Sequence, residues 1–437
     1  MGGPLLALFL GGIIMRIPIG FALAAASMGV LFIMTDYPLQ VGAQRIVAGI
    51  TPFGLLAIPL FILAGGLMGA GGLTKRMLAF AEVLVGGMRG GLAQTTMLAS
   101  LIFGGISGSS VANLSSLGRI MTPAMISRGY TRGYTAAVNA TAPVNDPIMP
   151  PSITMIVFGV VTGTSIGNLF FAGIVPAFIF IGLMMLVVHF TVLKQGFTDE
   201  VKAKAANPKD IGKIAKEDRP SASKAFVEAI PALIMPVIIL VGIRGGFFTP
   251  TEAAAVAVVY ALLVGLLYRE LTFKTLIYGM IDSAITVGLI MLVLAAAQLY
   301  SWALTAGRVP EQIADALFSV SDNKYVILLM MNVLLLIAGM FLEANAALII
   351  IAPILLPVAL AIGMDPVHLG IVVVVNMSIG LITPPVGIVL MLAAALAKVS
   401  MVKAIKAVLP FLGVMLIYLM LITYVPEISL WLPRVLL

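Results

Sequence analysis

Cysteine is absent from the 437-residue sequence, and histidine occurs only twice. Without cysteine, the chain has no disulfide framework, no thiolate-ligated metal and no thiol nucleophile, so no transition-metal site is expected. Charged residues make up 10% of the chain and hydrophobic residues 61%, whereas a soluble domain carries about 25% charged residues. These scarcities exclude a soluble globular protein and predict a chain whose surface faces a lipid bilayer.

The sequence contains many long apolar runs. Several approach or exceed the roughly 20 residues that cross a bilayer as a helix, and about a dozen crossings are expected. The first run lacks a basic leader and continues past Arg16, so it is expected to be a retained helix. The net charge of +7 comes from cations in short loops, which orient membrane proteins, so no nucleic-acid partner is expected. We predict an all-α polytopic membrane protein.

The chain consists of two similar halves. A polar segment at 194–224, with eight Lys or Arg and five Asp or Glu, predicts a cytoplasmic linker at 194–225 between a first repeat, 1–193, and a second, 226–437. A shift of 234 residues without gaps superposes four prolines of one half on four of the other: Pro123 on Pro357, Pro150 and Pro151 on Pro384 and Pro385, and Pro176 on Pro410. Repeats of this kind are common in membrane carriers, and we expect these to be inverted.

Each half contains an apolar segment interrupted by proline, glycine and polar residues, at 136–160 and 371–394. Irregular backbone at membrane depth persists only where it is buried in protein or lines a cavity, so both segments are predicted to be broken helices at a functional site. A re-entrant hairpin is predicted before each, near 94–127 and near 326–362. The 234-residue shift places Ser109 of the first hairpin on Glu343 of the second, and two similar pockets are expected.

Where a helix unwinds, its carbonyl oxygens lose their partners within the helix, and together with Ser and Thr hydroxyls they are suitable ligands for Na⁺. The N-termini of half-helices carry partial positive charge, which suits an anionic solute. We therefore expect two sodium sites with an anion between them. Gly, Ser and Thr also let transmembrane helices pack closely, and Gly104 and Gly108 have the GxxxG spacing typical of such packing. Because the break recurs in both halves, a functional role is favoured over packing alone. The predicted sodium ligands are Ser107, Gly108, Ser109, Ser110, Asn113, Pro150, Pro151 and Ser152 in the first half, and Glu343, Asn345, Thr383, Pro384 and Gly387 in the second. The predicted substrate-binding residues are Asn139, Thr141, Asn145, Asp146, Asn376 and Ser378.

Carboxylates at membrane depth are costly and are therefore functional candidates. Asp146 and Glu343 are the clearest cases, and either could bind a cation or a proton. Asp282 is interpreted as a residue near a helix end whose side chain reaches water. Glu252 is interpreted as structural, because the sequence from Thr249 to Glu252 reads as a capping box that opens a helix.

At these residues the sequence resembles the large membrane subunit of tripartite ATP-independent periplasmic (TRAP) transporters. The motifs that carry the resemblance are GGISGSSVA at 104–112, PPSITMIVFG at 150–159, TGTSIGNLFFAGIVP at 162–176, FTPTEAAAVAVVYAL at 248–262 and VNMSIGLITPPVG at 375–387. The resemblance implies about eleven transmembrane helices and two re-entrant hairpins, divided into a scaffold and a transport domain that moves as an elevator. It also implies a bacterial inner-membrane location and Na⁺-driven uptake of organic acids such as C4-dicarboxylates, sialic acids or keto acids, with Na⁺ as the coupling ion and no other cofactor.

The same resemblance implies two protein partners, a small four-helix membrane subunit and a soluble periplasmic substrate-binding protein. We expect the small subunit to be a separate polypeptide. One departure is that Asn145 and Asp146 precede the PPS motif where the family has small or apolar residues.

Other classes of function have weaker support. The residues Gly105 to Gly108 match the GxSG pattern of an intramembrane serine protease, but the two possible partners, His189 and His368, are both expected at the membrane interface. The sequence contains neither a potassium-channel filter nor a nucleotide-binding GxxxxGK[ST] loop. An ion-coupled carboxylate carrier that needs no binding protein remains an alternative.

Overall fold

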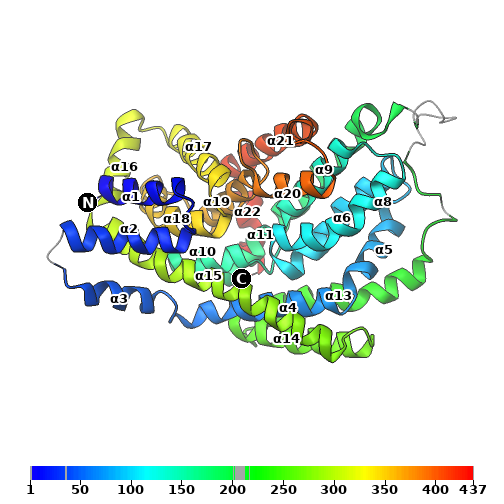
Figure 1. Cartoon of the computed structure of the whole chain (residues 1–437), viewed down its shortest axis with the longest axis horizontal. Coiled ribbons are helices and arrows are strands. Elements are labelled where there is room, and N and C mark those ends of the chain that lie inside the picture. The colour runs from blue at the N-terminus through cyan, green and yellow to red at the C-terminus, as the bar shows by residue number, and fades with distance from the viewer. Residues whose placement is uncertain (1, 35–36, 200, 202–211, 216, 437) are drawn as a thin grey trace.

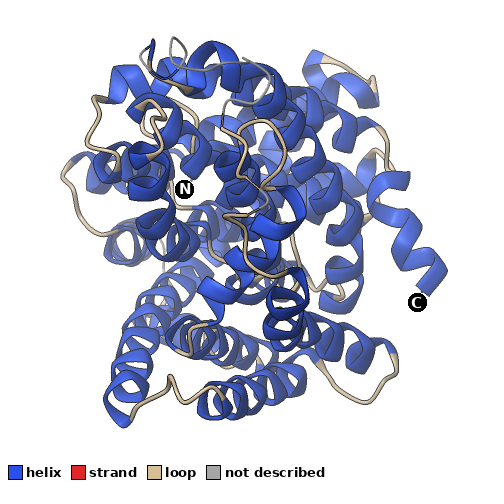
Figure 2. Cartoon of the chain, turned by 90° about the vertical axis from the view of Figure 1, so that its right-hand side faces the viewer, coloured by secondary structure: helices blue, strands red, loops and turns tan. Residues whose placement is uncertain are grey.

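The computed structural model describes residues 2–34, 37–199, 201, 212–215 and 217–436, and its elements are helices (Figure 2). Within these residues, eight helices are long and apolar enough to cross a membrane, and five shorter apolar helices accompany them. The prediction of an all-α polytopic membrane protein is therefore confirmed. Much of the predicted linker at 194–225 lies outside the described residues.

One group of helices, here called the long-helix layer, runs along one side of the molecule, with α4, α13, α14 and α15 at its centre (Figure 1). Within it, α4 packs against α14 and α15, while α2 and α3 pack against α15. Its elements are α1 (Gly2–Ile14), α2 (Ile19–Met34), α3 (Leu39–Ala48), η1 (Phe53–Leu56), α4 (Ala57–Ala70), α5 (Leu73–Val85), α13 (Ala222–Arg244), α14 (Pro250–Leu267) and α15 (Phe273–Ala306). Helix α16 (Val309–Val320) follows α15 and lies away from the centre of this layer (Figure 1).

The other group, here called the interrupted-helix layer, contains the interrupted helices of both repeats and the helices that pack against them. In its first half these are α6 (Gly91–Ser107), α7 (Ser110–Asn113), η2 (Leu114–Gly118), α8 (Arg119–Ser127), α9 (Arg132–Thr141), η3 (Ala142–Asn145), α10 (Ile153–Thr162), α11 (Ile166–Thr191) and η4 (Val192–Gly196). In its second half they are α17 (Lys324–Phe341), α18 (Ala344–Ala361), α19 (Pro366–Gly380), α20 (Ile388–Leu396), α21 (Met401–Tyr424) and α22 (Glu427–Leu436).

The 234-residue register seen in the prolines also holds for the ends of helices. Three boundaries of the first half recur 234 residues later: α6 ends at Ser107 and α17 at Phe341, α8 ends at Ser127 and α18 at Ala361, and α9 begins at Arg132 and α19 at Pro366. The two halves therefore place their helix ends at matching positions.

Helix capping explains several of these boundaries. Ser109 precedes α7 and accepts a hydrogen bond from the Ala112 amide (3.5 Å), while Glu343 precedes α18 and accepts from the amides of Asn345 (3.0 Å) and Ala346 (3.1 Å). A side-chain acceptor at this position satisfies amides that have no partner within the helix. The predicted capping box of α14 is confirmed, because Thr249 and Glu252 each accept from the other's amide.

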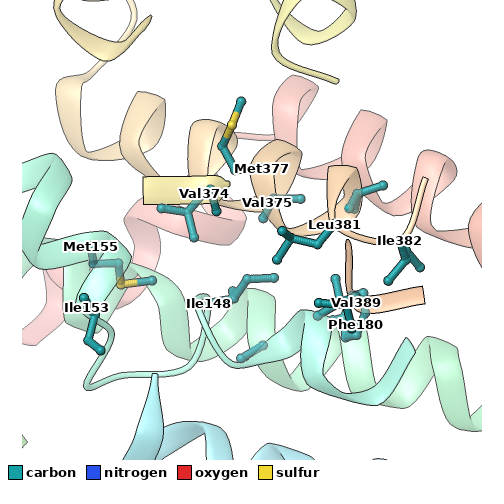
Figure 3. Close-up of a cluster of buried hydrophobic side chains, with 14 of the residues drawn as sticks. Ile148, Ile153, Met155, Phe180, Val374, Val375, Met377, Leu381, Ile382 and Val389 are labelled. Atoms are coloured by element: carbon teal, nitrogen blue, oxygen red, sulfur yellow. The ribbon is translucent and has the colours of Figure 1, made fainter. Parts of the chain in front are cut away.

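A hydrophobic core joins the two halves of the interrupted-helix layer. Figure 3 shows Ile148 and Met155 of the first half in one cluster with Val374, Leu381 and Val389 of the second. All five side chains are buried. This packing brings the irregular segments of the two repeats together, although they are far apart in sequence.

Candidate functional site

The first irregular segment, break 1 (residues 142–152), separates α9 from α10. It begins with the 3₁₀ turn η3 and contains the cis bond between Pro150 and Pro151. The Ser152 hydroxyl donates to the Pro147 carbonyl (2.6 Å) and accepts from the Met155 amide (3.2 Å). Ser152 therefore closes the loop and caps α10 at the same time.

The hairpin tip of the first half, tip 1 (residues 107–112), rests directly on break 1. The chain reverses at Gly108, whose φ of 58° is in the left-handed region that favours glycine. A Cβ atom there would lie 3.0 Å from the Ile153 amide nitrogen and 3.1 Å from the Pro151 carbonyl oxygen. Only a glycine backbone can approach break 1 this closely.

The second irregular segment, break 2 (residues 381–387), separates α19 from α20. It contains the second cis bond, between Pro384 and Pro385, and ends at Gly387, whose φ is 54°. The Thr383 hydroxyl donates to the Ile379 carbonyl (2.7 Å). Break 2 thus occupies the place in the second repeat that break 1 occupies in the first.

A cavity of about 810 Å³ lies between the two layers and reaches both hairpin tips. Its wall in the interrupted-helix layer includes tip 1 and tip 2 (residues 342–345), with Glu343 and Asn345 on its surface. The long-helix layer contributes α4 and α15. The cavity-lining residues of these two helices are Ile62, Gly65, Gly66, Gly69, Ala70, Asp282, Ser283, Thr286, Leu289 and Ile290. The two tips therefore share one cavity, while the expected pair of similar pockets, one at each tip and its break, stays a prediction.

The predicted ligands divide into those on the cavity wall and those behind it. Six of the predicted sodium ligands line the cavity: Ser107, Gly108, Ser109, Ser110, Glu343 and Asn345. The others are not among its lining residues: Asn113, Pro150, Pro151, Ser152, Thr383, Pro384 and Gly387. All of these except Pro384 are buried. Their role in binding sodium stays a prediction.

The predicted substrate-binding residues are all buried behind the cavity wall: Asn139, Thr141, Asn145, Asp146, Asn376 and Ser378. Asn376 belongs to a buried network that joins three helices, in which it donates to Asn332 (2.8 Å) and Asn332 donates to Thr423 (2.9 Å). Asn139 donates to Thr122 (3.3 Å) and to the Thr135 carbonyl (3.0 Å). Their assignment as substrate ligands also stays a prediction.

Two charged residues on the cavity wall were not recognised as site residues. Asp282 lies well inside the 34-residue α15 and lines the cavity, so its placement near a helix end was wrong. Arg119, at the start of α8, also lines the cavity. A single arginine within the predicted hairpin was the available signal, because a cation at membrane depth is a functional candidate.

The two histidines lie apart from the cavity. His368 is buried near the start of α19, where its Nε2 is 2.9 Å from the Ile422 carbonyl oxygen, and the ring of His189 contacts that of Phe190. Ser107 is on the cavity wall and accepts a hydrogen bond from the Ser109 amide (3.4 Å). The geometry around Ser107 is that of a hairpin turn.

Spanning helices, two interrupted helices and a cavity between two layers, lined by both polar and apolar residues, define a polytopic membrane transporter. Residues 6–428 match the family model described as "Tripartite ATP-independent periplasmic transporter, DctM component". The chain belongs to this family, which is the one that its motifs resemble, and it is an integral protein of the inner membrane.

Named relatives agree with this assignment. The chain is 36% identical over 454 residues to the C4-dicarboxylate TRAP transporter large permease protein DctM of Vibrio cholerae, covering 99% of this chain and 97% of that protein. It is 38% identical over 426 residues to the isethionate TRAP transporter permease protein DctMQ of Oleidesulfovibrio alaskensis, covering 97% of this chain and 65% of that protein. The solved structure of the Alcanivorax borkumensis YdaH transporter is similar in fold alone, with a TM-score of 0.58, 16% identity, and coverage of 96% and 97% of the two chains.

Proposed function

We propose that the protein takes up a small organic acid, driven by Na⁺ and delivered by a soluble periplasmic binding protein. The observation that carries this proposal is the single cavity where both hairpin tips meet helices of the long-helix layer. In the proposed elevator mechanism, the interrupted-helix layer moves across the membrane against the long-helix layer and carries the cavity's contents with it. The substrate is a C4-dicarboxylate, a sialic acid, a keto acid or a similar anion.

The ions bind where the tips meet the breaks. Tip 1 and break 1 carry hydroxyl and carbonyl oxygens, and so do tip 2 and break 2. Such oxygens are suitable ligands for a hard monovalent cation. A small four-helix membrane subunit completes the transporter as a separate polypeptide in this proposal. The name DctMQ, and the 65% of that relative which this chain covers, support a second membrane component.

Arg119 is the proposed contact for the substrate's carboxylate. It lines the cavity, and no described acidic side chain forms an ion pair with it. A guanidinium binds carboxylates through paired hydrogen bonds, which a lysine ammonium does not reproduce. Among the lining residues of this cavity Arg119 is the cation available to an anion, while Asp282 and Glu343 contribute negative charge to the cavity.

The decisive experiment measures uptake of labelled organic acids into proteoliposomes that contain this chain and the small subunit. Uptake that requires both an inward Na⁺ gradient and the binding protein is the expected result. Uptake without the binding protein would instead establish the alternative, an ion-coupled carboxylate carrier that works alone. Failure to transport under any gradient would reject both and return attention to the remote alternative of an intramembrane serine protease.

Substitution of Arg119 is expected to weaken substrate binding more than turnover. Arg119→Ala should raise the KM for uptake by about tenfold or more, because a charge-assisted contact is lost, and Arg119→Lys should recover only part of the affinity. The measurement is the concentration dependence of uptake in proteoliposomes. A KM equal to that of the unaltered protein in both variants would remove Arg119 from the substrate site.

Removing one hydroxyl group, from tip 1 or from break 2, is expected to weaken the dependence of uptake on Na⁺ without unfolding the protein. Ser109→Ala and Thr383→Ala each remove one proposed ligand, one in each half of the site. Uptake rates at varied Na⁺ concentration should require several-fold more Na⁺ in both variants, while thermal unfolding of the purified proteins stays close to that of the parent. If both retained the parent's Na⁺ dependence, the sodium-site assignment would be wrong.

A further inference from the structure

Asp146 is a fully buried carboxylate at the start of the loop in break 1. Its Oδ1 atom accepts hydrogen bonds from Asn113 Nδ2 (2.9 Å) and from the Ser100 hydroxyl (3.4 Å), while its Oδ2 atom has no hydrogen-bond partner. No described lysine or arginine forms an ion pair with it. A buried carboxylate that is not paired with a cation is strongly unfavourable in the ionised state.

Further oxygen atoms around Asp146 have no donor. The side-chain oxygens of Asn113 and of Asn145, the residue before Asp146, are buried and form no hydrogen bond, and neither does the side-chain nitrogen of Asn145. Asn113 has already used its amide nitrogen, which donates to Ser100 (2.6 Å) and to Asp146. Carboxylate and amide oxygens without donors suit a small hard cation, because one such ion binds several of them at once whereas a proton satisfies only one.

The second repeat shows that the fold does not require this polar cluster. At positions 234 residues after Ser100, Asn113 and Asp146 the chain has Leu334, Ala347 and Gly380. There the helices close by direct contact of glycine backbones, since a Cβ atom on Gly380 would lie 2.5 Å from the Gly339 carbonyl carbon. The second repeat therefore has no charged or polar side chain at any of these three positions.

The first repeat accommodates the carboxylate through a glycine on the facing helix. A Cβ atom on Gly104 of α6 would lie 2.9 Å from Asp146 Oδ1 and 3.0 Å from Asp146 Cα. Helix α6 also carries Ser100, while Asn113 lies on the returning arm of the hairpin. The carboxylate therefore contacts both arms of the first hairpin.

We propose that Asp146 is the anionic ligand of a Na⁺ site that it forms with the side-chain oxygens of Asn113 and Asn145. The proposal rests on the proposed sodium coupling and names the group that supplies the negative charge. A bound monovalent cation makes the site neutral, so the interrupted-helix layer crosses the bilayer without an unpaired charge at this position. When the ion leaves, the buried charge favours opening of the hairpin and entry of water.

The test is thermal unfolding of the purified full-length chain at increasing Na⁺, with choline as the replacement cation. Na⁺ should raise the Tm of the parent protein in a saturable way. Asp146→Asn keeps the shape of the side chain and removes its charge, so half-maximal stabilisation should require about tenfold more Na⁺ or more. Glu427→Gln, which removes an exposed carboxylate far along the chain, should leave the Na⁺ response unchanged.

A second variant and a pH series keep the proposal testable if Asp146→Asn does not fold. Asn145→Ala removes another proposed ligand without changing any charge and should also weaken the Na⁺ response by several-fold. Parental Na⁺ affinity in a folded Asp146→Asn protein overturns the proposal. The proposal is also overturned if the Tm of the parent depends on pH without Na⁺, the Tm of Asp146→Asn does not, and Na⁺ still stabilises that variant. Asp146 would then bind a proton and not Na⁺.

Failure of this inference and failure of the proposed function are distinguishable. If uptake depends on Na⁺ while Asp146→Asn binds Na⁺ like the parent, only the assignment of Asp146 fails. If Asp146→Asn loses Na⁺ stabilisation while uptake by the parent ignores the Na⁺ gradient, the site stands and sodium-driven transport fails.

Discussion

Replacing Gly69 with leucine is expected to reduce uptake by at least about tenfold, a loss worth about 1.4 kcal/mol if it acts through substrate binding. Gly69 is on the cavity wall in α4, and a Cβ atom built there meets no other atom within 4 Å. A leucine side chain at this position therefore extends into the cavity and takes space that the substrate needs. Leucine also favours the helix more than glycine does, so the fold should not be weakened.

Gly182→Leu is the matched control for this substitution. Gly182 is exposed on α11 and does not line the cavity, and a Cβ atom there likewise meets no other atom within 4 Å. Uptake by this variant should equal that of the parent. The measurement compares initial uptake rates at equal amounts of reconstituted protein, and full activity of Gly69→Leu would place the transport route outside this cavity.

Replacing Gly380 with alanine is expected to destabilise the protein by about 1–3 kcal/mol, the usual cost of overpacking a well-packed interior. The new Cβ atom would lie between 2.5 and 2.7 Å from three backbone atoms of Gly339. Backbone atoms cannot rotate away as a side chain does, so α17 and α19 must separate beside break 2. We expect a lower Tm for the purified protein, together with slower uptake because the geometry of break 2 changes.

The control for helix propensity is Gly413→Ala. Gly413 lies within α21, is exposed, and has no atom within 4 Å of a new Cβ. Alanine there should leave the Tm unchanged or raise it, since it favours the helix by about 1 kcal/mol over glycine. Equal Tm values for the two variants would mean that the contact between α17 and α19 is not as close as described.

The prolines and the glycine-rich motifs locate the two breaks from the amino-acid sequence alone. Pro150 and Pro384 interrupt their helices at matching places, because proline lacks the amide hydrogen that a helix needs. The local sequence similarly predicts the capping box at Thr249, since capping depends on residues three positions apart. Signals of this kind are local, and a single sequence contains them.

Which residues face the cavity is not accessible in this way. Asp282 and Gly69 belong to helices of the long-helix layer, and they meet the hairpin tips only through packing between distant parts of the chain. The polar residues within break 1 are all chemically suited to contact a substrate, yet Asn145 and Asp146 are buried in the protein interior. Hydropathy does not distinguish a side chain buried among helices from one that lines a polar cavity.

The sequence by itself determined the membrane class, the two repeats, the positions of both breaks and the family, because each depends on composition, on spacing along the chain or on local backbone chemistry. Only the tertiary structure decided that both tips share one cavity, that Arg119 and Asp282 line it, and that Asp146 lies behind it in contact with Asn113. These facts depend on how helices from opposite ends of the chain pack together, and that packing is set by many weak contacts that no local pattern records.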